Sequence, residues 1–270
     1  MDTKAQNIDA KAQQLRSLHQ GPAILALPNA WDVASARIFE NAGFAAIGTS
    51  SAGVAFSLGY QDGQNISRDE MIAVIARITK ALKIPVTADV EGGYGDPAET
   101  ARRVWAAGAV GMNLEDSPGG QVLNDLDDQK AQIRAIRKAV PGMVINARTD
   151  IFLNSIGEEA ARTEATIARL NAFLDAGADC VFAPGVRDLP AITALAQAIH
   201  GPLNILAVVG SPSLAEMSAA GVRRVSLGSG PMRATLGLID RIAHELKETG
   251  TYKAMTESAI LYSDVNKMFV

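Results

Sequence analysis

Short apolar runs alternate along this chain with longer segments in which apolar positions recur every three or four residues. The short runs predict strands, and the longer segments predict amphipathic helices, several opening with Asp or Ser and closing in Gly. Strict alternation of strand and helix predicts parallel strands joined by helical crossovers. The eight predicted strands cover residues 23–28, 44–49, 85–91, 109–115, 143–149, 178–183, 203–208 and 223–228.

An Ala-Gly pair precedes every second predicted strand, in the segments NAGFAAIG, AAGAVGMN, DAGADCVF and AAGVRRVS. Each glycine is expected to end the preceding helix in the left-handed conformation. A repeat in every second unit favours a closed α/β barrel of the (β/α)8, TIM type over the alternative, an open doubly wound sheet. We expect residues 1–270 to form a single barrel domain with extra helices from about residue 250 to 270.

Polar residues are concentrated where four of these strands end, and they repeat at two-residue spacing. Side chains at such spacing point to the same side of a strand, here the barrel lumen, where active sites of such barrels lie. Carboxylates gathered there with one arginine would repel one another unless a cation joined them, and oxygen ligands alone favour Mg²⁺ or Mn²⁺. Alternatively, these residues only cap strand ends. They are Thr49, Ser50 and Ser51; Thr87, Asp89 and Glu91; Asn113 and Glu115; and Asn146, Arg148 and Asp150.

Four motifs fall in order on these strands: TSSAGVAFSLGYQDG, ADVEGGYG, NLEDS and NARTD. With them the chain resembles the phosphoenolpyruvate mutase and isocitrate lyase superfamily over nearly its whole length. The resemblance implies a barrel enzyme that binds a 2-oxo or 2-hydroxy carboxylate with Mg²⁺ and cleaves a bond through an enolate.

The resemblance also implies a role for individual residues. Asp89 is expected to bind the metal directly and to face the substrate, while Glu91, Glu115 and Asp62 orient metal-bound water. A catalytic set is expected from Arg148, Asp62 and Glu115, with Arg148 also contacting the substrate. The substrate carboxylate is expected at Ser50, Ser51 and the backbone of Ala52.

The loop that follows the fourth predicted strand departs from the family. Lyases of the family carry a cysteine in a basic loop there, whereas residues 117–129 contain no Cys, Lys or Arg, and only Asn124 remains as a substrate-binding candidate. Ala183-Pro184-Gly185 also stands where the lyases have a second glutamate. We therefore predict a Mg²⁺-dependent carbon–carbon lyase or decarboxylase of small 2-oxo or 2-hydroxy (di)carboxylates. Carbon–phosphorus chemistry on phosphonopyruvate-like substrates and a non-catalytic oxo-acid-binding barrel remain as alternatives.

Charge and composition argue against nucleic acid and membrane as partners. A net charge of −4 offers no basic patch for nucleic acid, and no apolar run reaches the roughly 20 residues of a membrane span. The single cysteine, Cys180, and the polar start of the chain favour a cytoplasmic protein. The family resemblance implies a homo-oligomer, a tetramer or dimer, with C-terminal helices swapped between subunits through apolar residues at 259–262 and 268–270.

Overall fold

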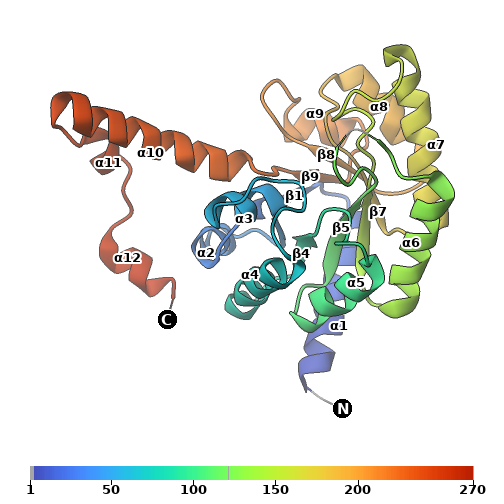
Figure 1. The fold of residues 1–270 in the computed structure, drawn as a ribbon, viewed down its shortest axis with the longest axis horizontal. Helices are drawn as coiled ribbons and strands as arrows, with labels where there is room; N and C mark the ends of the chain where they lie inside the picture. Colours follow the sequence, from blue (N-terminus) through green and yellow to red (C-terminus); the bar gives the residue numbers. More distant parts are fainter. Residues whose placement is uncertain (1–2, 121, 270) are drawn as a thin grey trace.

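The computed structural model describes residues 3–120 and 122–269, and it shows a nearly closed barrel of parallel strands surrounded by helices (Figure 1). The predicted α/β barrel of the TIM type is confirmed. The strands are β1 (Leu25–Leu27), β2 (Asn29–Ala30), β3 (Ile47–Thr49), β4 (Val86–Asp89), β5 (Gly111–Glu115), β6 (Val144–Arg148), β7 (Cys180–Ala183), β8 (Leu203–Leu206) and β9 (Arg224–Ser226). The helices around them are α2 (Val33–Asn41), α3 (Ser51–Ser57), α4 (Arg68–Ala81), α5 (Pro97–Ala106), α6 (Leu126–Ala139), α7 (Arg162–Asp175), α8 (Leu189–Ala198) and α9 (Leu214–Ala219).

The first predicted strand is divided in two at Pro28. β1 pairs with β9 on one side, and β2 pairs with β3 on the other, so the barrel closes through this bend. Proline has no N–H to donate to a strand partner, which interrupts the ladder. Its carbonyl still accepts a bond from the Gly48 amide at 2.9 Å. The prediction of eight strands was therefore correct for the barrel positions and wrong for this break.

The glycines of the Ala-Gly repeat adopt the predicted left-handed conformation. Gly43, Gly108, Gly177 and Gly221 have φ values of 89°, 94°, 111° and 99°, each just after the end of a helix. A residue with a side chain is strained in this region, whereas glycine adopts it freely. The repeat therefore marks four helix ends that lead into β3, β5, β7 and β9.

A helix that the sequence analysis did not predict, α1 (Thr3–Gln20), precedes the barrel. It buries Ala12 and Leu15 against a small apolar cluster that includes Leu25, Val110 and Val144. These three residues lie at the starts of strands, so α1 covers the end of the barrel opposite the carboxyl ends of the strands.

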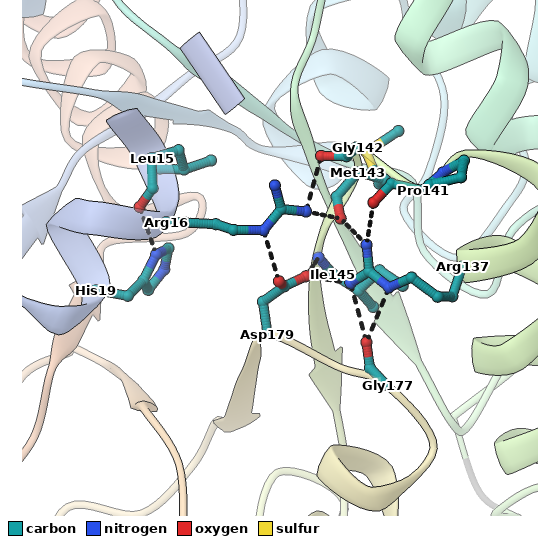
Figure 2. A network of polar contacts seen from close by, with 10 residues as sticks. All are labelled: Leu15, Arg16, His19, Arg137, Pro141, Gly142, Met143, Ile145, Gly177 and Asp179. Atoms are coloured by element: carbon teal, nitrogen blue, oxygen red, sulfur yellow. Dashed lines mark hydrogen bonds and ion pairs between the residues drawn. The ribbon is translucent and has the colours of Figure 1, made fainter. Parts of the chain in front are cut away.

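Asp179 ties this end of the barrel together (Figure 2). It precedes β7, and its two carboxylate oxygens accept from Arg16 Nε of α1 at 2.9 Å and from Arg137 Nη2 of α6 at 2.5 Å. The Ile145 amide also donates to Asp179 Oδ2, at 2.8 Å. Both arginines donate further to the Met143 carbonyl. One carboxylate thus joins α1, α6 and β6.

Replacing Asp179 with alanine is expected to destabilise the fold by about 3 kcal/mol, because it leaves two partly buried guanidinium groups without their charged partner and one strand amide without its acceptor. Urea unfolding would measure the change. Asp175→Ala is the matched control, because Asp175 is largely exposed, pairs only with His200 and should cost under about 0.5 kcal/mol. Equal unfolding midpoints for the two variants would contradict this role of Asp179.

The last part of the chain reaches away from the barrel (Figure 1). It consists of α10 (Gly230–Thr249), α11 (Lys253–Thr256) and α12 (Tyr262–Lys267), so the expected extra helices are present. Val270, one of the apolar positions expected to pack there, lies outside the described residues. Within residues 3–120 and 122–269, no helix has the length and apolar composition needed to cross a membrane.

Candidate active site

The register of the parallel strands places the polar strand ends side by side. Asp89 of β4 is in register with Asn113 of β5, which is in register with Asn146 of β6. Two positions further along, Glu115 is in register with Arg148. Registered neighbours in a sheet share a face, and Asn146 Nδ2 donates to Asn113 Oδ1 at 2.8 Å. Strand alternation thus brings Asp89, Glu115 and Arg148 to one end of the lumen.

Asp89 is held by the end of β3 and the start of α3. Its amide donates to Thr49 Oγ1 at 2.8 Å, and its Oδ2 accepts from Ser51 Oγ at 3.0 Å and from the Ser51 amide at 3.3 Å. Its other oxygen, Oδ1, is buried and has no hydrogen-bond partner among residues 3–120 and 122–269. The carboxylate is therefore fixed in direction and keeps one oxygen free for a ligand.

Glu91 reaches the site by a different route from the predicted one. β4 ends at Asp89, and Glu91 follows it with φ +52°, so strand alternation does not place its side chain. Gln64 and Tyr94 also have positive φ, and Gln64 Oε1 accepts from the Tyr94 amide at 2.9 Å. Non-glycine residues in this region are strained, and such strain persists where the surrounding structure enforces it. The left-handed turn directs Glu91 into the site.

Glu91 is 2% exposed, and within the part of the chain that the structure describes its Oε2 has no hydrogen-bond partner. Oε1 lies 3.5 Å from the Tyr94 hydroxyl. Burial, and then repulsion by the carboxylates of Asp89 and Asp62, raise the pKa of Glu91 to about 7. A carboxylate in this setting is stabilised by any cation that approaches it.

Arg148 lies between two carboxylates. Its Nη1 is 2.9 Å from Glu115 Oε2, and its Nε and Nη2 donate to the two oxygens of Asp150 at 2.5 and 3.1 Å. Burial raises the pKa of Glu115 to about 8 even though Arg148 opposes the change. The Asp150 and Glu115 carboxylates offset the cost of burying the Arg148 charge and raise the pKa of the guanidinium. Arg148 remains a cation at the site.

Asp62 lies in the exposed segment between α3 and α4. Reduced hydration and then the nearby Asp89 carboxylate raise its pKa, while Arg148 acts in the opposite direction. Both groups are therefore near enough to Asp62 to act on its charge. The structure brings Asp62 to the same end of the barrel as the strand carboxylates.

The residues predicted to hold a substrate carboxylate divide into two groups. Ser50, Ser51 and Ala52 lie at the start of α3, where Ser50 Oγ accepts from the Gly53 amide at 3.1 Å. Asn124 is engaged elsewhere, because its Nδ2 donates to Gln129 Oε1 at 2.8 Å. The start of α3 thus adjoins Asp89, whereas the amide of Asn124 serves the base of its own loop.

The carboxylates at this end of the barrel suit a magnesium ion that keeps part of its water shell, and they do not form a complete protein cage around a metal. Five carboxylates lie at this end, and two of them, Glu115 and Asp150, pair with Arg148. Within the described residues, the buried Asp89 Oδ1 and Glu91 Oε2 have no hydrogen-bond partner. Among residues 3–120 and 122–269, no three His, Cys, Asp or Glu side chains are arranged to enclose a metal. Mg²⁺ commonly takes one or two carboxylates and keeps several waters, so this donor set suits it. The five are Asp62, Asp89, Glu91, Glu115 and Asp150.

Sequence reasoning missed a second layer of residues behind Arg148. Ser117 Oγ donates to Asp150 Oδ2 at 2.6 Å, and the Asp150 amide donates to Asp116 Oδ1 at 3.0 Å. Asp116 is fully buried and pairs with Arg169 of α7. Asp116 and Ser117 follow Glu115 directly, so their position was a usable signal. Arg169 lies mid-helix, and no pattern in the sequence marks it.

Comparison with known proteins shows the family and the fold of this chain. The family model described as phosphoenolpyruvate phosphomutase matches residues 15–247. An uncharacterized Mycobacterium tuberculosis protein is 39% identical over 219 residues, covering 81% of this chain and 82% of that protein. The oxaloacetate decarboxylase of Bradyrhizobium diazoefficiens is 29% identical over 265 residues, covering 91% and 88%. A solved structure described as a lyase/mutase of Burkholderia cenocepacia superposes with a TM-score of 0.91 at 38% identity, covering 98% and 97%.

Proposed function

This chain belongs to the phosphoenolpyruvate mutase and isocitrate lyase superfamily, and from that membership we propose that it is a Mg²⁺-dependent carbon–carbon lyase or decarboxylase. The proposed substrates are small 2-oxo or 2-hydroxy (di)carboxylates. The observation that carries the proposal is the group of five carboxylates at the carboxyl end of the barrel. Two of them pair with Arg148, and within residues 3–120 and 122–269 the buried Asp89 Oδ1 and Glu91 Oε2 have no hydrogen-bond partner. Such a cluster is repulsive by itself and becomes favourable around a cation and an anionic substrate.

The chain's own residues would share the chemistry as follows. Asp89 Oδ1 would bind the ion, while Glu91, Glu115 and Asp62 orient its water molecules. Magnesium, when bound, supplies positive charge next to an oxygen that becomes negative during bond cleavage. When the bond to the departing carbon of a 2-oxo acid breaks, its electron pair delocalises to that oxygen as an enolate. Arg148 would stabilise the same charge, because it is fixed before the reaction.

The loop after β5 favours carbon–carbon over carbon–phosphorus cleavage. A transferred phosphoryl group needs several cationic or amide donors around its oxygens. Residues 117–129 contain no Lys or Arg, and the amide of Asn124 is engaged with Gln129. Arg148 already serves Glu115 and Asp150. A planar carboxylate substrate needs fewer hydrogen-bond donors than a phosphoryl group, so it suits this site better.

Turnover on a substrate panel tests the proposal. Malate, alkylmalates, oxaloacetate and phosphonopyruvate would each be incubated with Mg²⁺ or with EDTA, and products followed by proton and phosphorus NMR. We expect release of a 2-oxo acid from at least one carbon substrate, abolished by EDTA. Oxaloacetate loses CO₂ slowly without an enzyme, so Asp89→Ala with Mg²⁺ is the background control. Turnover of phosphonopyruvate alone would establish the alternative, and metal-dependent binding without any product would establish a non-catalytic barrel.

Magnesium affinity is expected to rise between about pH 6 and pH 8. The raised pKa values of Glu91, about 7, and Glu115, about 8, mean that both carboxyls hold protons at the low end of this range. A cation favours the ionised forms, so binding should release protons and strengthen as pH increases. Calorimetry in buffers of different ionisation enthalpy would count the released protons. An affinity that is constant over this range, with no proton release, would contradict the assignment.

We also propose that the C-terminal helices pack against another copy of this chain. α10 leaves the barrel with Leu236, Ile239 and Leu246 exposed, and Leu261 and Tyr262 are exposed beyond it. An exposed apolar surface of this kind typically marks an association site. The occupant proposed is a second copy, because homo-oligomers with closed symmetry are the commonest assemblies.

Light scattering should therefore report at least a dimer for the wild-type chain. Ile239→Glu is expected to reduce the mass, because it places a charge in the apolar surface. Lys247→Glu, an exposed polar position of the same helix, is the matched control and should leave the mass unchanged. A monomeric wild-type protein would refute the proposed assembly.

A further inference from the structure

Arg169 joins the two ends of the loop after β5. Its Nε lies 2.5 Å from Asp116 Oδ2, and its Nη2 donates to the Asn124 carbonyl at 2.5 Å. The backbone N–H of Asn124 in turn donates to the backbone carbonyl of Asp116 at 2.7 Å. The planar guanidinium therefore binds both ends of this loop at once, as its fork of donors allows.

Asp116 connects Arg169 to the site through a second hydrogen bond. It is fully buried, and while Oδ2 pairs with Arg169, its Oδ1 accepts the Asp150 amide at 3.0 Å. The Asp150 carboxylate then binds Arg148 through two hydrogen bonds. A continuous series of short polar contacts runs from α7 to the guanidinium that faces the carboxylate cluster.

The starting point of this series is rigid. Arg169 projects from the interior of α7, and its guanidinium carbon lies 5.5 Å from the ring centroid of Phe173, one turn along the same helix. Phe173 is fully buried in the core. Packing and the cation–π contact thus fix the direction of Arg169 independently of the loop that it binds.

We propose that Arg169 is a positioning residue for the reaction, setting the orientation of Arg148 through Asp116 and Asp150. The proposal rests on the proposed function, because it assumes that Arg148 stabilises charge during bond cleavage. Among the described residues, the polar partners of Arg169 are Asp116 and the Asn124 carbonyl, neither of which belongs to the carboxylate cluster, so its effect on the reaction would be indirect. A loosened Arg148 would lose stabilisation of the transition state more than binding of the substrate.

Arg169→Lys is the test, because lysine keeps the charge and cannot hold Asp116 and the Asn124 carbonyl as one planar fork. We expect kcat to fall by about 10- to 100-fold, the range typical for residues that orient metal-site ligands, with KM changed less than about twofold. The matched control is Arg162→Lys on the same helix, since Arg162 binds only the Ser155 and Gly157 carbonyls. Its kcat should stay at the wild-type value.

A second readout does not depend on turnover. The Asp150 amide should exchange with deuterium faster in Arg169→Lys than in the wild type, because its acceptor, Asp116, is less constrained. If Arg169→Lys does not fold, Asp116→Asn tests the next contact and should show the same selective loss of kcat. Wild-type kcat in either variant, or unchanged Asp150 exchange in Arg169→Lys, would overturn the proposal. Absence of turnover in the wild-type enzyme would instead refute the proposed function. The exchange of the Asp150 amide would then decide by itself whether Arg169 positions Asp116 and Asp150.

Discussion

Asp89→Ala is expected to reduce metal-dependent turnover by at least about 1,000-fold, because it removes the expected direct ligand of the ion that stabilises the enolate oxygen. The fold should survive the change. Asp89 Oδ1 has no protein partner, and the donors to Oδ2 come from Ser51 at the start of a helix, where water can replace the carboxylate. Without metal, the melting temperature should be unchanged or higher, because Asp89 repels Glu91 and Glu115.

Turnover and calorimetric Mg²⁺ binding would be measured on the same preparations of Asp89→Ala. Asp69→Ala is the matched control, since Asp69 is an exposed carboxylate of α4 that pairs with Arg103 on the surface. It should behave as the wild type in both measurements. Equal Mg²⁺ affinity in Asp89→Ala and the wild type would show that Asp89 is not the ligand.

Arg148→Lys is the second change with a large expected effect. Lysine retains the positive charge and loses the planar arrangement that binds Glu115 and both oxygens of Asp150. We expect kcat to fall by about 100- to 1,000-fold, the effect of losing one fixed donor to a developing oxyanion. Steady-state kinetics would measure it.

The stability of Arg148 variants separates charge from geometry. Arg148→Met should destabilise the metal-free fold by about 3 kcal/mol or more, because two buried carboxylates lose their only cation, whereas Arg148→Lys should cost less. Arg102→Lys, at an exposed surface pair with Glu99, is the control and should alter neither rate nor stability. Wild-type kcat in Arg148→Lys would show that the arginine serves only the packing of its neighbours.

Local rules were sufficient where a residue type has one dominant conformational reason. Gly43 and Gly108 end helices in the left-handed conformation, as the Ala-Gly repeat predicted. Ser67 caps α4 in a capping box with Glu70, as expected for helices that open with Asp or Ser. The barrel could be predicted because these signals recur along the whole chain.

The sequence pattern was insufficient where distant segments determine the conformation. Pro28 divides the first strand, but its neighbours β3 and β9 decide that both pieces remain in the barrel. Glu91 was assigned to a strand face because it lies two residues after Asp89, whereas a left-handed turn places it. The Arg169–Asp116 pair spans 53 residues, and no local pattern indicates that these two residues meet.

A crystal structure with Mn²⁺ and oxalate, phased with the anomalous signal of manganese, would test whether Asp89 and Arg148 form a metal and carboxylate site. Mn²⁺ accepts the same oxygen ligands as Mg²⁺, and oxalate is a planar dicarboxylate of the size expected for the substrate. We expect one anomalous peak at the mouth of the barrel, bound by Asp89 Oδ1 and both oxalate carboxylates, with water molecules held by Glu91 and Glu115 and with Arg148 on the oxalate. A well-ordered site without an anomalous peak next to Asp89, or oxalate bound elsewhere, would contradict it.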